Sequence, residues 1–345
     1  MTFTPVLIRL SERAGFDVVC VLLATAGFSW MGFVFEFTCL GLAIDLFRLT
    51  SVLTQKIVSI RLLPSLRGKM QFLLPATGAL VLCAYGFIEA RAITVRHVPV
   101  TTSKLTNTDR TIKIVQISDL HLGLTFSNKR LRAIVDTINA ESPDLVVATG
   151  DIVESHASDM AALVNTLQMI KAPAGKFAVT GNHEYYTGIV KSIDFLTQAG
   201  FTVLENSRKS VEGLDIVGVN DPTSRYMQGT LNSNTTAKAF DQASSERFTL
   251  LLKHRPVVSA KQLGHFDLQL SGHSHKGQLF PFNFLVQLQH PLPHSTLIDT
   301  QPGLLYVNPG TGTWGPPFRI LAPPEITVLT LSPAGQTSSA KAVNL

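Results

Sequence analysis

The feature that most restricts the fold of this chain is a regular alternation of strand and helix patterns beginning at residue 111. Short runs rich in β-branched residues occupy 111–118, 144–149 and 176–180, and helical patterns occupy 128–140 and 158–170 between them. Consecutive β-α-β units place their strands in parallel, with the helices packed outside the sheet. The pattern therefore predicts an α/β domain with a largely parallel sheet.

Further β-rich runs follow with fewer helical patterns between them. They lie at 214–219, 248–253, 266–271, 304–308 and 325–331. Strands this close together leave little room for crossover helices, so we expect them to form a second sheet that packs on the first.

Side chains able to bind metals follow many of these predicted strands. The stretches are Asp119–His121, Gly150–Asp151, Gly181–Glu184, His254 and Gly272–His275. In open α/β sheets, ligands bind beyond the carboxyl ends of the strands. We therefore expect the five stretches to meet at one edge, although any one of them alone is common by chance.

The chemistry of these side chains suits a pair of divalent ions. Carboxylate, imidazole and amide oxygen donors favour ions such as Mn, Fe or Zn over ions that demand thiolates. Asp151 can bridge, because a carboxylate has two oxygens and paired metals lie about 3.5–4 Å apart. The glycines before Asp151, Asn182 and His273 allow the backbone to turn sharply beside the ions. Together the stretches predict a two-metal site.

The ordered set D-x-H, G-D, G-N-H-E, H and G-H-x-H resembles the calcineurin-like metallophosphoesterase superfamily over residues 111–331. GHSHKGQLFP at 272–281, together with the stretch at 306–331, resembles a bacterial membrane-linked branch that includes the secreted YkuE-like phosphoesterases. The resemblance implies a four-layer α/β/β/α sandwich, preceded here by N-terminal transmembrane helices. It also implies a binuclear metal centre of Mn, Fe, Zn or Mg.

Carried over position by position, the resemblance implies two sets of ligands. One metal would be held by Asp119, His121, Asp151 and His275, and the other by Asp151, Asn182, His254 and His273. A hydroxide activated by the metals would attack phosphorus. His183 would lie beside the leaving oxygen and stabilise or protonate it, which makes His183 and Asp151 the expected catalytic residues. Glu184 is expected to orient His183 or to pack.

Three basic residues near these motifs are candidates for contact with substrate phosphate. Lys253 and Arg255 flank His254, and Lys276 stands where the family pattern leads us to expect glycine. Basic side chains can bind phosphate oxygens directly. The alternative is that they are solvated surface charges.

The first hundred residues have a different character. Residues 18–35 and 72–88 contain no charged side chain, and each is close to the length that spans a hydrocarbon core of about 30 Å. We expect helices over about 18–44 and 72–88, joined by a basic amphipathic connection at 45–71. The expected domains are thus a membrane anchor at 1–99 and a metallophosphoesterase domain at 100–345. The alternative for the apolar segments is two buried helices of a soluble domain.

The flanking charges indicate an orientation for the anchor. The connection carries Arg48, Lys56, Arg61, Arg67 and Lys69. The positive-inside rule places such a loop in the cytoplasm. We therefore expect a multi-pass protein of the bacterial inner (plasma) membrane with an extracytoplasmic catalytic domain.

Charge also bears on the partners. Residues 1–99 hold nine Lys/Arg against five Asp/Glu, so of the totals of 29 and 24 the remaining residues hold 20 against 19. Such a balanced domain gains little from counterion release, so we expect no nucleic-acid partner. The sequence leaves the oligomeric state open.

The expected function is metal-dependent hydrolysis of a phosphomonoester, a phosphodiester or a pyrophosphate. The apolar stretch at 279–288 directly after the last metal motif favours a lipid-linked substrate as one candidate. Two alternatives stay open: a general cell-surface nucleotide phosphodiesterase, and a non-catalytic metal-binding scaffold on the same fold.

Overall fold

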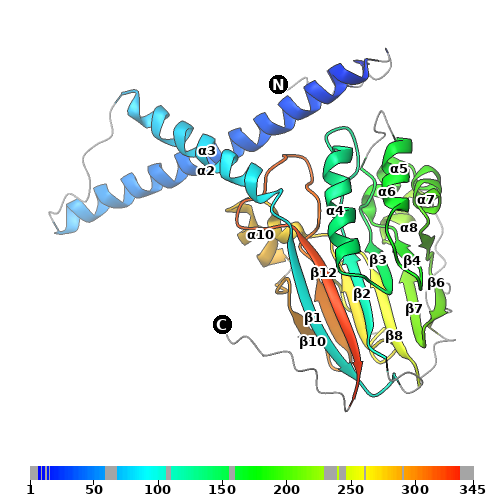
Figure 1. The fold of residues 1–345 in the computed structure, drawn as a ribbon. Coiled ribbons are helices and arrows are strands. Elements are labelled where there is room, and N and C mark those ends of the chain that lie inside the picture. Colours follow the sequence, from blue (N-terminus) through cyan, green and yellow to red (C-terminus); the bar gives the residue numbers. More distant parts are fainter. Residues whose placement is uncertain are drawn as a thin grey trace. The chain divides into compact units, whose positions relative to one another are not determined.

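The computed structural model divides into two compact units, which we call the helical unit and the two-sheet unit (Figure 1). The helical unit combines residues 1–92 with 277–288 and 313–323, and the two-sheet unit holds 93–276, 289–312 and 324–345. The structure describes residues 7–8, 10–11, 14, 16–58, 68–105, 110–154, 160–228, 239–240, 246–259, 262–289 and 291–334.

The first sheet of the two-sheet unit has the strand order β1-β12-β2-β3-β4-β5. Its strands are β1 (Thr94–Thr102), β12 (Glu325–Pro333), β2 (Ile112–Ile117), β3 (Leu145–Thr149), β4 (Lys176–Val179) and β5 (Thr202–Val203). Strands β2 to β5 run parallel, whereas β12 is antiparallel to β2. The carboxyl ends of β2, β3 and β4 therefore meet at one edge.

The second sheet has the order β10-β11-β9-β8-β7-β6. Its strands are β10 (Leu297–Asp299), β11 (Leu304–Val307), β9 (Leu268–Ser271), β8 (Phe248–Lys253), β7 (Leu214–Val219) and β6 (Ser207–Val211). The four central strands are parallel and the two edge strands pair antiparallel. Side chains of both sheets form one buried core, for example Ile114 and Val147 with Leu250 and Leu270.

Helices cover the outer face of the first sheet (Figure 1). They are α4 (Asn128–Ala140), α5 (Met160–Gln168) and α7 (Ile189–Gln198), and the short helices α6 (Asn182–Thr187) and α8 (Thr223–Gln228) follow strand ends. The amphipathic pattern of α4 buries Leu131, Ile134, Val135 and Ile138. The side chain of Ser127 caps its first turn by accepting a hydrogen bond from the Arg130 amide.

The predicted layers of sheets and helices are confirmed, with two corrections in the first sheet. The strand at 325–331 was expected in the second sheet, but β12 lies in the first, between β1 and β2, with Val328 opposite Val115. Strand β1 was not predicted, because its first residues were assigned to the membrane anchor. Pairing between β1 and β12 joins residues more than 200 positions apart, which local patterns do not reveal.

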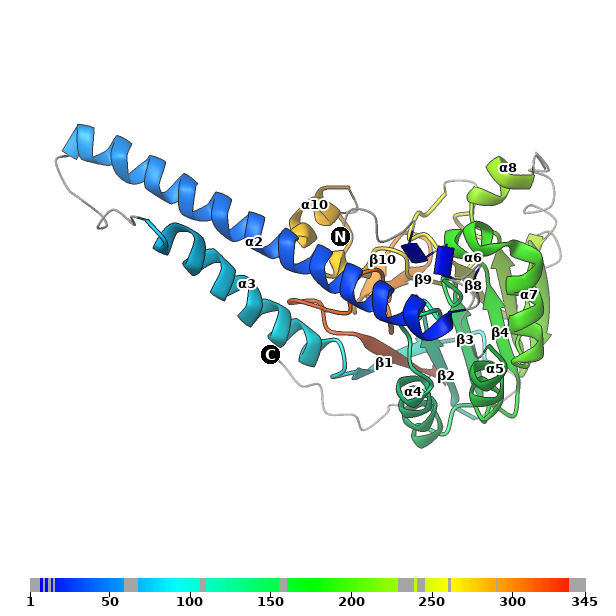
Figure 2. The same cartoon turned by 90° about the horizontal axis from the view of Figure 1, so that it is seen from above.

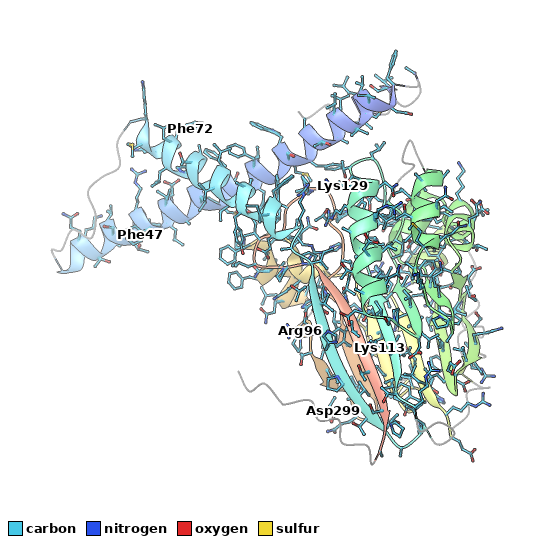
Figure 3. The ribbon with its side chains drawn as sticks, in the orientation of Figure 1. Phe47, Phe72, Arg96, Lys113, Lys129 and Asp299 are labelled. Atoms are coloured by element: carbon cyan, nitrogen blue, oxygen red, sulfur yellow. The ribbon has the colours of Figure 1, made fainter. Side chains whose placement is uncertain are left out.

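The helical unit is built on two long helices that lie side by side (Figure 2). Helix α2 (Asp17–Val58) and helix α3 (Met70–Glu89) are both long and apolar enough to cross a membrane, judged by length and composition alone. Helix α2 continues unbroken past residue 44 into the expected connection, whose residues 59–67 lie outside the described part of the chain. Exposed apolar side chains project from both helices, including Phe47 and Phe72 (Figure 3).

Candidate metal centre

The five predicted stretches meet at the carboxyl ends of parallel strands. Asp119 follows β2, Asp151 follows β3 and Asn182 follows β4, whereas His254 and His273 follow β8 and β9 of the second sheet. Backbone hydrogen bonds join the loops, with the His121 amide donating to Asp151 O at 3.0 Å and the Gly272 amide donating to His254 O at 2.9 Å. The two sheets thus bring together side chains separated by more than 150 residues.

One group of donor atoms belongs to Asp119, His121 and His275. Their ligand atoms lie within 4.8 Å of one another, and all three side chains are buried. His121 Nε2 is 3.0 Å from His275 Nε2, and His275 Nε2 is 3.4 Å from Asp119 Oδ1. These atoms converge on one point, as the ligands of a single ion would.

A second group belongs to Asp151, His254 and His273. His254 Nε2 lies 3.1 Å from Asp151 Oδ2 and 3.0 Å from His273 Nδ1. Asp151 Oδ2 is also 4.0 Å from His121 Nε2, which places this carboxylate between the two groups. Asn182 Oδ1 is buried and has no hydrogen-bond partner among the described residues.

These residues fit a pair of divalent ions. Two imidazole nitrogens that both bind one ion at about 2.1 Å would be about 3–3.5 Å apart. The imidazole pairs His121–His275 and His254–His273 both show this separation. A buried amide oxygen without a partner is costly, and a metal would satisfy Asn182 Oδ1.

The backbone at this edge adopts a conformation that L-residues avoid. Asp119, His121, Asp151, His273 and His275 all have positive φ, between 49° and 78°. Each such residue costs about 1–2 kcal/mol, and such strain collects at functional sites. The surrounding hydrogen bonds hold the loops in this form, which indicates that the positions of the donor atoms matter more than local stability.

Hydrogen bonds also set which ring nitrogen faces the centre. His254 Nδ1 lies 2.8 Å from Thr149 O, and His121 Nδ1 contacts the carboxylate of Glu154. A carbonyl or carboxylate at Nδ1 fixes the proton there and leaves Nε2 to face the metal. Both Nε2 atoms belong to the convergent groups described above.

Burial alone would raise the pKa of Asp151, but the charge and hydrogen bond of His254, with the charges of His121 and His183, hold this pKa well below its ordinary value. The carboxylate is therefore ionised near neutral pH. A bridging metal ligand requires this state.

His183 lies beside the first group, with Asp151 Oδ1 accepting a hydrogen bond from its backbone amide at 2.9 Å. A ring nitrogen of His183 also comes within 4.8 Å of the donor atoms of His121 and Asp151, so these three form a further group that could hold an ion. Burial lowers the pKa of His183, but the hydrogen bond with Glu154 and the charge of Asp151 outweigh it, and the pKa is raised. A protonated imidazole at this position can act as an acid.

Glu154 was not predicted as a functional residue. Its carboxylate contacts Nδ1 of His121 and lies 2.8 Å from Nδ1 of His183, so it joins a candidate ligand to the candidate acid. Burial would raise the pKa of Glu154, but hydrogen bonds with both histidines lower it to about 2. The available signal was its position three residues after Asp151 on the same loop.

Glu184 was expected to orient His183 or to pack. Its side chain is fully buried, as packing requires, and Glu154 is the carboxylate that contacts His183. The buried carboxylate of Glu184 accepts hydrogen bonds from the backbone amides of Gly181, Asp151, Ile152 and Val153 at 2.7–3.0 Å. It therefore holds the strained loop that carries Asp151.

Comparison with known proteins identifies the family. The calcineurin-like phosphoesterase family model matches residues 112–277. An uncharacterized metallophosphoesterase of Helicobacter pylori is 32% identical over 323 residues, which cover 92% of this chain and 83% of that protein. The chain belongs to the calcineurin-like metallophosphoesterase family. The family matches the resemblance expected from the five motifs.

Two further relatives are similar to a large share of this metallophosphoesterase. The uncharacterized metallophosphoesterase YkuE of Bacillus subtilis is 34% identical over 64% of this chain and 78% of its own length. A protein of Danio rerio named transmembrane protein with metallophosphoesterase domain is 32% identical over 74% of this chain and 61% of its own length. The bacterial branch expected from the sequence is thus supported.

The three basic candidates of this metallophosphoesterase have distinct surroundings. The Lys253 amine is buried and donates to Val257 O at 2.6 Å and to Gln262 Oε1 at 3.1 Å, so it braces its own loop. Arg255 pairs with Asp221 through Nε at 2.8 Å and Nη2 at 3.2 Å. Lys276 is exposed beside His275. The contacts of Lys253 favour a structural role for that residue.

Gly272→Ala is expected to weaken metal binding. A Cβ at this glycine would overlap Ser118 Oγ and Asp119 Oδ2, so the added methyl group would displace a candidate ligand. Overpacking of this kind costs about 1–3 kcal/mol. Metal analysis and thermal unfolding of the purified variant would show lower metal content and a lower Tm. Gly41→Ala is the matched control, because its added Cβ would meet no other described residue within 4 Å beyond its chain neighbours and its own helix backbone; equal metal content in both variants would contradict the prediction.

Glu154→Gln is expected to lower kcat about 10- to 100-fold with little effect on KM, because the amide keeps the shape but loses the charge that orients His121 and His183. Steady-state kinetics with a soluble aryl phosphate would measure this change. Glu154→Asp should lose less activity than the glutamine variant if charge matters more than reach. Wild-type kcat in Glu154→Gln would rule out the positioning role.

Proposed function

We propose that this protein is a membrane-anchored hydrolase of phosphate esters that works with two divalent metal ions. The observation that carries the proposal is the placement of Asp151 between two groups of metal-binding side chains, with His183 and Glu154 beside the first group. A metal-binding residue stands at every candidate ligand position. Catalysis requires the complete set, whereas a non-catalytic scaffold does not.

Asp119, His121, Asp151 and His275 would hold one ion, and Asp151, Asn182, His254 and His273 would hold the other. When bound, Mn, Fe, Zn or Mg ions would activate a water molecule and neutralise charge on the phosphoryl oxygens. The protein's own part is to present these donors without rearrangement. The strained loops and the hydrogen bonds of Glu184 and Thr149 serve this end.

His183 would donate a proton to the leaving oxygen as the bond from phosphorus to that oxygen breaks. Glu154 would hold the His183 ring through Nδ1 and keep it protonated by its negative charge. Arg255, held by Asp221, and exposed Lys276 would contact the substrate phosphate. Basic side chains can bind the phosphate oxygens of monoesters, diesters and pyrophosphates alike.

We place the protein in the bacterial inner (plasma) membrane, with α2 and α3 as the spans and the two-sheet unit outside the cytoplasm. Both helices have the length and composition of spans, and the Danio rerio relative is named a transmembrane protein. The five basic residues from Arg48 to Lys69, in the last turns of α2 and before α3, support this orientation. Protease added to intact spheroplasts should cleave the two-sheet unit; protection of this unit until lysis would reverse the orientation.

A lipid-linked phosphate ester is the substrate class that this location favours. The uncharged stretch at 279–288 follows His275 by only three residues, so an apolar surface is covalently close to the candidate centre. Hydrolysis of lipid-linked and soluble phosphate esters should be compared in the same detergent micelles. Turnover of soluble esters alone would limit the anchor to a role in location.

The test of the proposal is hydrolysis of p-nitrophenyl phosphate and bis-p-nitrophenyl phosphate by the purified full-length protein with added Mn. We expect turnover of at least one ester, loss of turnover with a chelator and recovery when metal is restored. Bound metal without hydrolysis of any soluble or lipid-linked ester would favour the non-catalytic scaffold. Absence of both metal and activity would overturn the proposal.

A further inference from the structure

Two segments from late in the chain belong to the helical unit. They are residues 277–288, which include most of helix α10 (Phe282–Gln289), and residues 313–323. Leu279, Phe318 and Ile320 are buried in a cluster with side chains of α2 and α3 that include Phe35 and Leu82. The Phe35 and Phe282 rings meet edge to face, with centroids 6.3 Å apart.

The attachment of 313–323 to the long helices is specific. The carboxylate of Glu89 at the end of α3 accepts hydrogen bonds from the amides of Leu321 and Ala322, at 3.1 and 2.8 Å. The Arg319 amide donates to Gly86 O at 2.9 Å. A Cβ at Gly32 would come within 2.7 Å of the Phe318 ring, so α2 carries a glycine where this segment packs. The surfaces of α2 and α3 are therefore complementary to the segment 313–323.

The outer surface of these segments is apolar. No residue of α10 is buried, and Phe284, Leu285 and Leu288 are 56%, 59% and 81% exposed. Trp314 and Leu321 are also more than half exposed. Residues 277–288 contain no charged side chain. The one charged residue of 313–323, Arg319, is fully buried and donates to Ala322 O at 2.9 Å. Exposed apolar side chains grouped on two segments that are hydrogen-bonded to each other mark an interaction site.

We propose that α10 and 313–323 form a membrane-contact surface that lies in the boundary between lipid headgroups and acyl chains. The contact at Phe35 lies on α2 at the last residue of its uncharged run 18–35, so a bilayer that covers this run also reaches α10. The irregular backbone of 313–323 is unsuited to the hydrocarbon centre. An amphipathic helix at the boundary inserts its apolar face about 5–10 Å deep, and tryptophan prefers the same depth.

This surface is joined by short connections to the candidate metal centre. The chain enters the first segment two residues after His275, and it enters the second directly after Gly312, whose amide donates to Asp119 O at 3.0 Å. Contact with lipid is thus tied covalently to two loops of the metal centre. The proposal concerns lipid contact alone and does not depend on phosphoesterase activity.

Tryptophan fluorescence provides the test, because the chain has only two tryptophans, Trp30 and Trp314. The full-length Trp30→Phe protein would be placed in phosphatidylcholine vesicles with bromine either near the top or deep in the acyl chains. We expect Trp314 to lose about half of its emission with shallow bromine and less with deep bromine. Emission unchanged by either lipid would overturn the proposal for 313–323.

A second variant tests α10 independently. In a Trp30→Phe and Trp314→Phe background, Leu288→Trp should be quenched by shallow bromine, whereas Tyr226→Trp on exposed α8 should be quenched by aqueous iodide only. Equal bromine quenching at both positions would show that lipid contact is not particular to α10 and would overturn the proposal. Leu288→Trp shielded from both quenchers would indicate a protein partner, such as a second copy, and would also overturn it.

Discussion

Asp151→Asn is expected to lower both metal content and turnover more than any other single change. The carboxylate lies 3.1 Å from His254 Nε2 and 4.0 Å from His121 Nε2, so among the described donors it would be the one shared by both ions. Removing its charge should reduce kcat/KM by about three orders of magnitude, or about 4 kcal/mol of transition-state stabilisation.

Metal analysis and steady-state kinetics of the same preparation would check this expectation. Asp194→Asn is the matched control, because Asp194 is an exposed carboxylate on α7 whose contact is a hydrogen bond from Gln198. It should keep wild-type metal content and rate. A variant at Asp151 that binds about two ions and turns over normally would contradict the assignment of this residue as the bridge.

His183→Ala is expected to lower kcat by about 100- to 10,000-fold while both ions stay bound. The ring is held by Glu154 at 2.8 Å and its pKa is raised, so it is placed to give a proton to the leaving oxygen. The loss should be larger for an alkyl phosphate than for p-nitrophenyl phosphate, because a nitrophenolate leaves readily without a proton.

Kinetics with both esters and metal analysis would separate the two roles open to His183. An equal loss with both esters would argue against proton donation. Loss of an ion from His183→Ala would instead make His183 a ligand, since its ring nitrogen also lies near donor atoms of His121 and Asp151. His97→Ala, a change to an exposed histidine on β1, is the control and should leave kcat unchanged.

The candidate ligands could be predicted from the sequence because they follow strands of a parallel sheet. Once 111–118 and 144–149 were recognised as neighbouring parallel strands, Asp119 and Asp151 had to lie at the same edge. The need for glycine beside the candidate ligands was also predictable. A Cβ at Gly181 would overlap Asp151, and a Cβ at Gly272 would overlap Asp119. These features depend on local patterns and on a general rule of topology.

The contacts of Glu154 could not be predicted from local sequence patterns. Its distance from Asp151 in sequence is short, but its contacts with His121 and His183 depend on loops from three strands. The spacing of residues along the sequence does not reveal these contacts. The different contacts of Glu154 and Glu184 have the same origin, since only the folded loops show which carboxylate contacts side chains and which contacts backbone amides.

The family, the alternation of strands and helices, the apolar helices and the candidate ligands were all predictable from residue order, because each depends on short local patterns. The folded chain was needed to find that β12 pairs with β1 and β2, that Glu154 contacts His183, and that 277–288 and 313–323 pack on α2 and α3. These last features arise from contacts between residues far apart in the chain. The free energy with which these contacts stabilise the fold comes from complementary surfaces that exist only after folding.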